Sequence, residues 1–280
     1  MAAAVAMTTP VNLDFEFVRD VVRRGSSIVL DPSKDYLVDA RLSPLARKEG
    51  FDSVGALIAR LRAETDGALR LKVIDAMTTN ETLFFRDLTP FDALRQKLLP
   101  EILKKRSAKR ELRIWSAACS SGQEPYTIAM LLRESFPQLA GWKVDILATD
   151  LSPTMIAKGR QGVYGRLEVN RGLPAALLAK YFKTVGLDFE IAPELRAMVT
   201  FRELNLATPW PALGTFDVIF LRNVLIYFDV PTKKSILSRA RQLLPSDGYL
   251  FLGAAETTLN LEERFERMPL ERSGCYRVAT

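Results

Sequence analysis

The stretch from Leu112 to Tyr126 constrains the fold more than any other part of the sequence. An apolar run, Leu112–Trp115, is typical of a buried strand and is followed by five small residues and Gly122. Apolar residues then recur at helical spacing, at Ile128, Leu131, Leu132 and Phe136. A strand, a small-residue turn and a helix in this order let a backbone approach a ligand at the first crossover of a parallel sheet. Small residues are also common in ordinary strand–helix turns, so the turn alone does not decide between the two.

Strands and helices go on alternating beyond this stretch. Lys143–Thr149 has the composition of a second strand and ends at Asp150, after which Ser152 and Pro153 supply a cap and a first helical position. Further buried strands are expected at Phe216–Leu221, Gly248–Gly253 and Cys275–Val278. This alternation predicts a doubly wound, Rossmann-like α/β sheet that is mostly parallel and has helices on both faces.

Other segments lie outside the alternation. Residues 12–77 are helical in pattern, and residues 1–11 are expected to be a flexible tail that is too short, and too poor in cations, for a signal peptide. Residues 78–111 are expected to be a linker with further helices, and residues 112–280 the α/β domain. Within it, residues 162–200 predict a small inserted β-hairpin subdomain, with a helix over Pro174–Phe182 and a hairpin formed by Leu187–Ile191 and Met198–Phe201.

The composition excludes several classes of site. The chain has no histidine, so Ser-His-Asp and Cys-His schemes are ruled out. Only two thiols remain, Cys119 and Cys275, and we therefore expect no metal site and a reducing cytoplasm as the location. No apolar run approaches the roughly 18 residues needed to cross a bilayer, so no membrane insertion is expected. The net charge of +6 favours acidic partners without choosing among them.

Two groups of cations stand out. The first is Lys34, Arg41, Arg47 and Lys48. Lys34, Arg41 and Lys48 are seven apart and would share one face of a single helix, unless Pro44 begins a second helix there. Such a face is either solvated or a docking face for an acidic partner. The second group is the run Lys104–Arg110, with five cations and no acid, which predicts a solvated turn.

Polar residues precede and follow the first strands. Thr78 and Glu81 fit a helix capping box, and Asn80, Thr82 and Arg86 form a polar set in the same segment. Asp150, about 30 residues past the small-residue turn, suits hydrogen bonds to ribose hydroxyls, although a turn-forming Asp is the alternative.

Five ordered stretches together carry a resemblance: residues 78–86, 115–126, 148–150, 204–206 and 222–228. With them the chain resembles the CheR family of chemotaxis-receptor glutamate O-methyltransferases. The resemblance implies S-adenosylmethionine as cofactor and S-adenosylhomocysteine as product. It also implies that helices within 78–111 cover the cofactor and that 112–280 is the methyltransferase domain.

The resemblance further implies roles for individual residues. The residues expected to bind the cofactor are Asn80, Thr82, Arg86, Ala117, Gly122, Glu124, Asp150, Asn205, Leu206, Arg222 and Asn223. Among them Glu124 would hold the amino group, Asp150 the ribose, and Asn205 with Leu206 the adenine. An acid favoured at a helix N-terminus is the alternative for Glu124. Arg86 and Tyr227 are the expected catalytic residues, and a buried core tyrosine is the alternative for Tyr227.

The implied reaction transfers a methyl group to glutamate carboxylates of a chemoreceptor's helical bundle. Glutamate has a pKa near 4.3, so the acceptor is already ionised at pH 7 and no general base is required. Two departures from the family pattern matter. Gly253–Glu256 lacks the histidine of the family's Gly-His-Ser-Glu, which weakens the transfer of a role to Glu256. Residues 183–198 are short, so a C-terminal receptor peptide tether is not expected. The alternatives are a methyltransferase acting on RNA or another protein, and a non-catalytic cofactor-binding module; a nucleic-acid partner is not expected, because the cationic run lacks interleaved aromatics.

Overall fold

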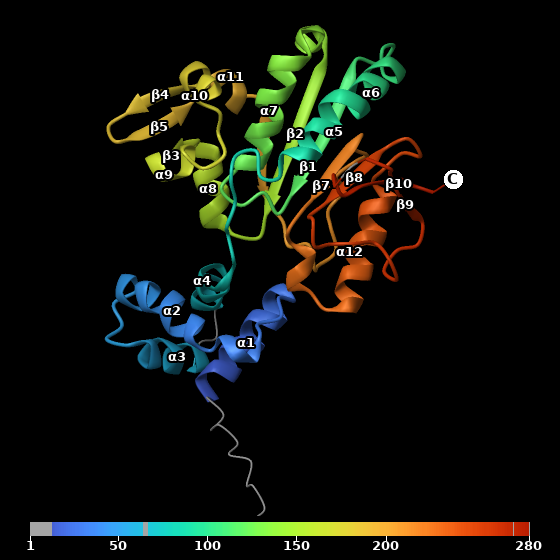
Figure 1. Ribbon diagram of the computed structural model, residues 1–280. Helices are drawn as coiled ribbons and strands as arrows, with labels where there is room; N and C mark the ends of the chain where they lie inside the picture. Colours follow the sequence, from blue (N-terminus) through green and yellow to red (C-terminus); the bar gives the residue numbers. More distant parts are fainter. Residues whose placement is uncertain (1–12, 64–66, 271, 280) are drawn as a thin grey trace, which may run out of the picture. The chain divides into compact units, whose positions relative to one another are not determined.

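The computed structural model describes residues 13–63, 67–270 and 272–279, and the chain divides into two compact units between Thr78 and Thr79 (Figure 1). The expected tail, residues 1–11, lies outside the described residues. No helix among the described residues is long and apolar enough to cross a bilayer.

The first unit is helical. Its elements are α1 (Leu13–Ser26), a 3₁₀ turn η1 (Pro32–Lys34), α2 (Tyr36–Lys48), α3 (Val54–Ala63) and α4 (Ala68–Met77). Each α-helix buries one apolar face, and fully buried residues include Val18, Leu42, Leu57, Leu61 and Val73. Among the described residues up to Met77, the predicted helical pattern therefore reflects a small core of its own.

Neither alternative for the cations of this unit is correct. Pro44 lies inside α2 and does not begin a second helix, and the Ser43 hydroxyl donates to Asp39 O at 2.6 Å. Lys34 precedes α2 in η1, so no single helix carries Lys34, Arg41 and Lys48. Arg41 also donates from Nη1 to Met77 O at 2.5 Å, which directs it toward α4.

The second unit is built on a seven-stranded sheet in the order β6-β2-β1-β7-β8-β10-β9. The strands are β1 (Glu111–Ala117), β2 (Lys143–Asp150), β6 (Val199–Glu203), β7 (Val218–Leu221), β8 (Tyr249–Leu252), β9 (Phe265–Arg267) and β10 (Cys275–Val278). The first five strands of this order run parallel, and β10 is antiparallel to both of its neighbours, β8 and β9. The predicted doubly wound, Rossmann-like sheet is confirmed.

Helices cover this sheet. They are α5 (Leu88–Ala93), a π-helical turn η2 (Leu94–Leu98), α6 (Leu99–Lys105), α7 (Gln123–Ser135), a 3₁₀ turn η3 (Pro137–Gly141), α8 (Pro153–Gln161) and α12 (Val230–Gln242). Residues of α5, η2, α6 and α7 share one core with the strand residues Ile114, Phe220 and Phe251. Side chains alternate across a strand, so Trp115 points to the other face, where it packs on Trp210 and Phe216.

The inserted subdomain is a three-stranded antiparallel sheet in the order β3-β5-β4, drawn in yellow in Figure 1. Its elements are β3 (Val163–Tyr164), α9 (Arg166–Val169), α10 (Ala175–Tyr181), β4 (Phe182–Val185), β5 (Asp188–Ile191) and α11 (Pro193–Arg196). The predicted hairpin partner Met198–Phe201 was wrong. Val199 and Phe201 are buried in the main core, and their strand pairs with β2 in parallel as β6.

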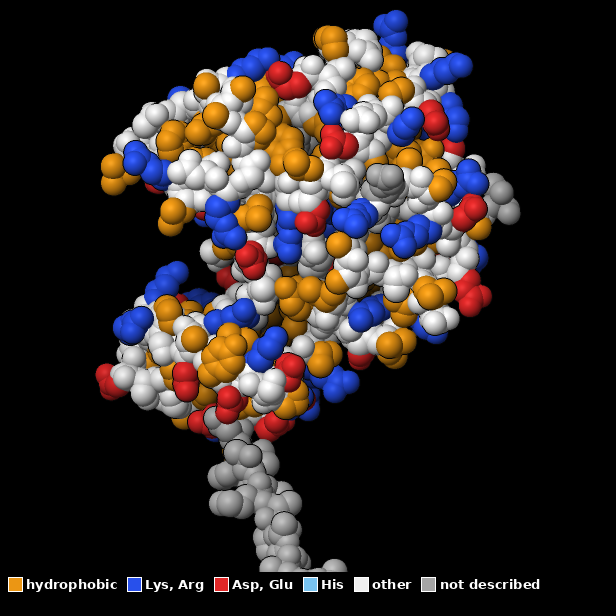
Figure 2. Space-filling model, in the orientation of Figure 1, with side chains coloured by type: hydrophobic (Ala, Val, Ile, Leu, Met, Phe, Trp, Pro, Cys, Tyr) orange, Lys and Arg blue, Asp and Glu red, His pale blue; other side chains and the backbone are white. Residues whose placement is uncertain are grey.

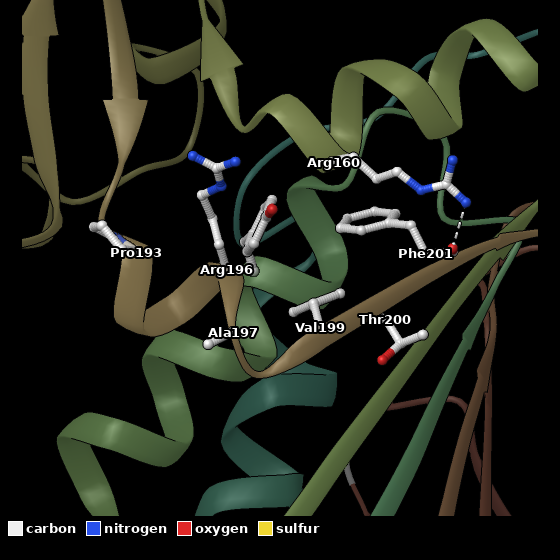
Figure 3. A pocket seen from close by; sticks show the side chains of 8 residues that line it. Arg160, Pro193, Arg196, Ala197, Val199, Thr200 and Phe201 are labelled. Atoms are coloured by element: carbon white, nitrogen blue, oxygen red, sulfur yellow. Dashed lines mark hydrogen bonds between the residues drawn. The ribbon is translucent and has the colours of Figure 1, made fainter.

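β6 is an edge strand, and an arginine covers part of that edge. Arg160 on α8 donates from Nη2 to Phe201 O at 2.8 Å (Figure 3). A cavity of about 640 Å³ lies beside this strand. It is lined by Tyr126, Arg160, Pro193, Arg196, Ala197, Val199, Thr200 and Phe201. None of the sequence-predicted site residues is among them, and a side chain bonded to the outer carbonyl blocks strand addition there.

The cationic run Lys104–Arg110 is not a solvated turn throughout, because Arg106 is held in an ion-pair cluster. Its Nε lies 2.8 Å from Asp217 Oδ1 and its Nη2 lies 2.7 Å from Asp247 Oδ1. Asp217 in turn accepts the N–H of Arg113 at 2.9 Å. Arg106 thus ties the end of α6 to the starts of β1, β7 and β8. The hydrogen bond from Arg106 is the main cause that lowers the pKa of Asp247.

We expect Asp247→Asn to lower the free energy of unfolding at pH 7 by about 1–2 kcal/mol, the range for a charge-assisted bond at a partly exposed site. The folded-state pKa of Asp247 is depressed, so this stability is present above about pH 4 and is lost as the pH falls through the folded-state pKa. Urea denaturation followed by tryptophan fluorescence at pH 7 and at pH 2–3 measures it, because Trp115, Trp142 and Trp210 all lie in the second unit.

The control is Asp92→Asn, whose ion pair with Arg95 is half exposed and should change the free energy by less than about 0.5 kcal/mol. An equal loss for Asp247→Asn at both pH values would show that packing, and not the charge, accounts for the effect.

Candidate active site

The carboxyl ends of four neighbouring parallel strands lie level with one another. Ala117 of β1 is opposite Thr149 of β2 and Leu221 of β7, and Asp150 is opposite Glu203 of β6. The segments that follow these strands are Ala118–Gly122, Leu151–Ser152, Leu204–Leu206 and Arg222–Asn223. The carboxyl ends of these strands therefore bring together the small-residue turn, Asp150 and the polar residues that the sequence had singled out. In open α/β sheets, ligands bind at this carboxyl edge of the sheet.

The small-residue turn after β1 is held in an uncommon backbone conformation. Ala118, Ser120 and Gly122 have φ angles of 56°, 49° and 95°. A Cβ on residue 122 would lie 3.0 Å from the Phe201 ring and 3.1 Å from the Tyr164 hydroxyl, so glycine is required at this position. The turn thus combines three left-handed residues with close packing underneath.

Asp150 supports this turn. One carboxylate oxygen accepts the N–H of Ser120 at 2.8 Å and the other accepts that of Ser152 at 2.9 Å. Ser152 caps α8 as predicted, accepting the N–H of Met155. Asp150 is 7% exposed and therefore reaches the edge of the sheet with its carboxylate already oriented.

The segment 79–87 is not helical, so the predicted capping box was wrong. Thr78 ends α4, its hydroxyl donates to Asp75 O, and the next helix begins only at Leu88. The segment lies against the site instead: Ser120 Oγ donates to Asn80 O at 2.7 Å, and Phe85 N donates to Thr127 Oγ1 at 3.1 Å.

Buried Phe84 anchors the same segment against Tyr164 and Phe182, with ring centroids 5.1 and 5.7 Å away. Half-buried Thr82 lies in the chain between Asn80 and Phe84, the two residues through which the segment is attached.

A buried arginine joins three parts of the site. The Arg222 side chain is 2% exposed, and its Nη1 lies 2.9 Å from Glu124 Oε2. Its Nη2 donates to Arg86 O at 2.8 Å and lies 3.0 Å from Asp87 Oδ2. The other oxygen of Glu124 accepts the Ser116 hydroxyl at 2.8 Å. Arg222 therefore links the end of β7, the first turn of α7 and the segment 79–87.

The two expected catalytic residues belong to segments that this arginine brings together. Arg86 is half-buried and donates from Nη1 to Glu81 O at 3.0 Å, while its carbonyl accepts from Arg222. Tyr227 is half-buried in the 3₁₀ turn η4 (Leu225–Tyr227), five residues after Arg222.

The loop after β6 is also held by several hydrogen bonds. Asn205 Oδ1 accepts the N–H of Ala207 at 2.9 Å. Leu206 is 5% exposed, and its carbonyl accepts from Trp210 Nε1 at 3.2 Å and from Arg239 Nη2 at 2.7 Å. In the separate loop after β7, Asn223 lies next to Arg222 and has a left-handed φ of 58°.

Sequence reasoning missed three contributors to this site. Asp87 and Ser116 lie directly beside predicted residues, yet only the fold shows that they bond to Arg222 and Glu124. Glu256 was given little weight because of the altered motif around it, but its carboxylate lies against the loop after β7.

The two cysteines are buried and free. Burial, reinforced by Asp150 and Glu124, raises the pKa of the Cys119 thiol well above its usual range. Burial also raises the pKa of Cys275 to about 12. Both thiols are therefore protonated at neutral pH, and neither is a nucleophile. Among the described residues no cluster of three or more acidic or thiol side chains has the arrangement needed to hold a metal ion.

Comparison with known proteins decides the family. Residues 13–78 match the protein family described as "CheR methyltransferase, all-alpha domain". Residues 80–273 match the family described as "CheR methyltransferase, SAM binding domain". The chain belongs to the CheR family.

Curated relatives agree along nearly their full length. Chemotaxis protein methyltransferase 1 of Pseudomonas aeruginosa is 44% identical over 95% of this chain and 98% of that protein. Chemotaxis protein methyltransferase Cher2 of Pseudomonas putida is 44% identical over 91% and 94%. The chemotaxis protein methyltransferase of Borreliella burgdorferi is 38% identical over 88% and 91%.

S-adenosylmethionine is thus the cofactor of this CheR-family methyltransferase, and the donor set at the sheet edge fits it. Two carboxylates, Asp150 and Glu124, and two amides, Asn205 and Asn223, lie at or soon after the carboxyl ends of β2, β1, β6 and β7, and residues 117–122 of the turn carry little side-chain bulk. Carboxylates suit an amino group and ribose hydroxyls, and amides suit the edge of a base.

We expect Arg222→Met to lower the free energy of unfolding by about 3–5 kcal/mol, because it leaves Glu124 largely buried without its cationic partner. Urea denaturation measures the loss. Arg222→Met combined with Glu124→Gln should recover at least about 1 kcal/mol of it. Arg277→Met, which removes an exposed pair with Glu266, should cost less than about 1 kcal/mol. A loss for Arg222→Met no larger than that of Arg277→Met would contradict the role given to this arginine.

Proposed function

We propose that this protein transfers a methyl group from S-adenosylmethionine to glutamate side chains of a chemoreceptor-like signalling protein, giving glutamate methyl ester and S-adenosylhomocysteine. Membership of a chemotaxis methyltransferase family supports it. The observation that carries it is the Arg222 cluster, which brings the segment containing Arg86 to the loop that leads to Tyr227. The site can thereby present a cation and a phenol to an anionic acceptor.

The residues available suit a carboxylate acceptor. A glutamate side chain is ionised at pH 7 and needs no proton removed, which agrees with a site that has no histidine and no thiolate. When bound, the cofactor supplies a methyl group on a positively charged sulfur, open to direct in-line attack. The protein's task is therefore alignment and exclusion of water, not proton transfer.

Arg86 would hold the acceptor. Removing a carboxylate from water raises its pKa and favours the neutral form, and a neighbouring cation opposes that shift. A guanidinium has five N–H donors, and the hydrogen bond from Arg86 to Glu81 O uses one of them. Charge-assisted hydrogen bonds from the others would orient the acceptor, with Tyr227 completing the orientation.

The cofactor would be held by the remaining residues of the edge. In this proposal Asn80 and Thr82 cover its methionine end, Ala117 and Gly122 lie beneath it, and Asp150 takes the ribose. Glu124 takes the amino group. Asn205 and Leu206 take the adenine, and Asn223 forms the floor near the sulfur. Arg222 contributes by fixing Glu124, since both terminal nitrogens of its guanidinium bond to protein partners and the side chain is almost fully buried.

We expect Arg86→Ala and Tyr227→Phe to lower turnover by roughly 10²-fold and tenfold, while changing the Kd of the cofactor by less than about fivefold, because they act on alignment. Asp150→Ala should mainly weaken cofactor binding. Calorimetric titration beside methyl-transfer kinetics separates the two effects, and thermal unfolding controls for the loss of the hydrogen bonds that Asp150 accepts from Ser120 and Ser152.

Wild-type turnover in Arg86→Ala would end its assignment. Mass spectrometry of a receptor fragment after incubation with enzyme and cofactor tests the reaction itself, and methyl esters on glutamate are the expected product. Methylation of RNA, or cofactor binding with no methylated product, would instead identify a different methyltransferase or a non-catalytic module.

The proposed partner is the cytoplasmic helical bundle of the receptor, and the enzyme accordingly works in the cytoplasm. Lys34, Arg47 and Lys48 are exposed, and Figure 2 shows Lys and Arg side chains gathered on the part of the first unit where α2 is drawn in Figure 1. Arg41 adds charge there while bonding to Met77. A receptor peptide tether is not part of the proposal, since only Gly186 and Leu187 join β4 to β5.

Docking through these cations should fade with salt, because the Debye length is about 8 Å at 0.15 M ionic strength. The triple variant Lys34→Ala, Arg47→Ala, Lys48→Ala should lower kcat/KM for receptor several-fold at low salt and by little at 0.5 M, with cofactor Kd unchanged. Lys104→Ala with Lys109→Ala, exposed cations of the other unit, is the matched control. Receptor methylation that is the same at low and high salt would refute the docking role.

A further inference from the structure

The carboxylate of Glu256 accepts hydrogen bonds from successive backbone N–H groups of the loop after β7. It accepts the N–H of Asn223 at 2.7 Å, of Val224 at 2.8 Å and of Leu225 at 2.7 Å, with a longer contact from Ile226 at 3.4 Å. The N–H of Gly253, on its own strand end, is a further donor at 2.7 Å. An ionised carboxylate is the one side chain that can accept this many bonds, because it has two oxygens and no donor.

The strand end that carries Glu256 is shaped for this contact. A Cβ on residue 253 would lie 2.6 Å from Asn223 Nδ2 and 2.8 Å from Glu256 Oε2, so only glycine lets the loop come so close. The turn from Gly253 to Glu256 is closed by its own backbone, with Glu256 N donating to Gly253 O at 2.9 Å. Ala254 and Ala255 between them are exposed, so the turn does not depend on their side chains.

The gathered loop is the one that leads from Arg222 to Tyr227. Asn223 has a left-handed φ of 58°, a conformation with a cost for a residue other than glycine. Successive N–H groups of Asn223, Val224 and Leu225 all converge on one carboxylate, and that convergence stabilises the conformation. The direction in which Tyr227 leaves the sheet therefore depends on the charge of Glu256.

We propose that Glu256 is a positioning residue for methyl transfer: it touches no reacting atom but fixes the loop that carries Asn223 and Tyr227. The proposal rests on the proposed function for the roles of those two residues. The positioning itself rests on the hydrogen bonds alone. Misplacing reacting groups by about 1 Å costs on the order of 100-fold in rate, so a loosened loop should appear in turnover.

The test compares Glu256→Gln with Glu262→Gln. Glutamine keeps the shape but loses the charge and turns an NH₂ group toward backbone donors. Glu262 is a buried glutamate six residues on, whose partners are on Arg264 and Arg241 and not on the loop. Glu256→Gln should lower turnover roughly 10- to 100-fold and weaken cofactor binding by less than about fivefold, while Glu262→Gln leaves both within about twofold.

Amide hydrogen exchange supplies a readout that needs no turnover. The N–H groups of Val224 and Leu225 should exchange at least about tenfold faster in Glu256→Gln and at the wild-type rate in Glu262→Gln. Unchanged exchange in Glu256→Gln, or wild-type turnover despite faster exchange, would overturn the proposal. A wild-type enzyme that methylates no receptor glutamate would refute the proposed function instead, and the exchange result would still decide whether Glu256 holds the loop.

Discussion

The site depends on one buried guanidinium. Arg222 leaves the end of a central strand and meets two carboxylates and a carbonyl from parts of the chain that are 98 to 136 residues away in sequence. Removing such a cation from water is costly unless every partner is in place, so the cluster forms only when β7, α7 and the segment 79–87 have assembled. A buried network of this kind favours one arrangement of the segments over others.

Around this cluster the edge of the sheet is built mainly from backbone. Asp150 accepts one N–H group from the turn after β1 and one from the segment after its own strand, and Glu256 accepts several from the loop after β7. Left-handed residues occur in both segments, at Ala118, Ser120 and Asn223, and each set lies beside the carboxylate that compensates it. A fold that places acids at strand ends can thus hold two irregular loops rigid enough for alignment chemistry.

Much of this could be predicted from the sequence, because local signals and tertiary structure agree there. Leu112–Trp115, Asp150 and the Ser152–Pro153 cap each have a short-range cause, and all lie where the pattern indicated. The errors have causes that no local pattern carries. The pattern at Val199 and Phe201 resembles half of a hairpin, but both side chains are buried in the main core and their strand pairs with β2.

Thr78 and Glu81 have capping-box spacing in a segment that tertiary hydrogen bonds hold in a non-helical conformation. Arg106 sits in a run that resembles a solvated turn, yet two distant aspartates bind it. The partners of Arg222 and the loop partners of Glu256 could not be predicted either, since each of these bonds spans 30 residues or more.

The burial of the two thiols determines how the native protein responds to oxidants. Cys119 lies in the turn after β1 and Cys275 within the sheet, both protonated and shielded from solvent. Oxidants that convert accessible thiolates to sulfenic acid or mixed disulfides find no such group on the native protein. Exposure to peroxide should therefore leave both thiols, and with them the turn after β1, chemically unchanged.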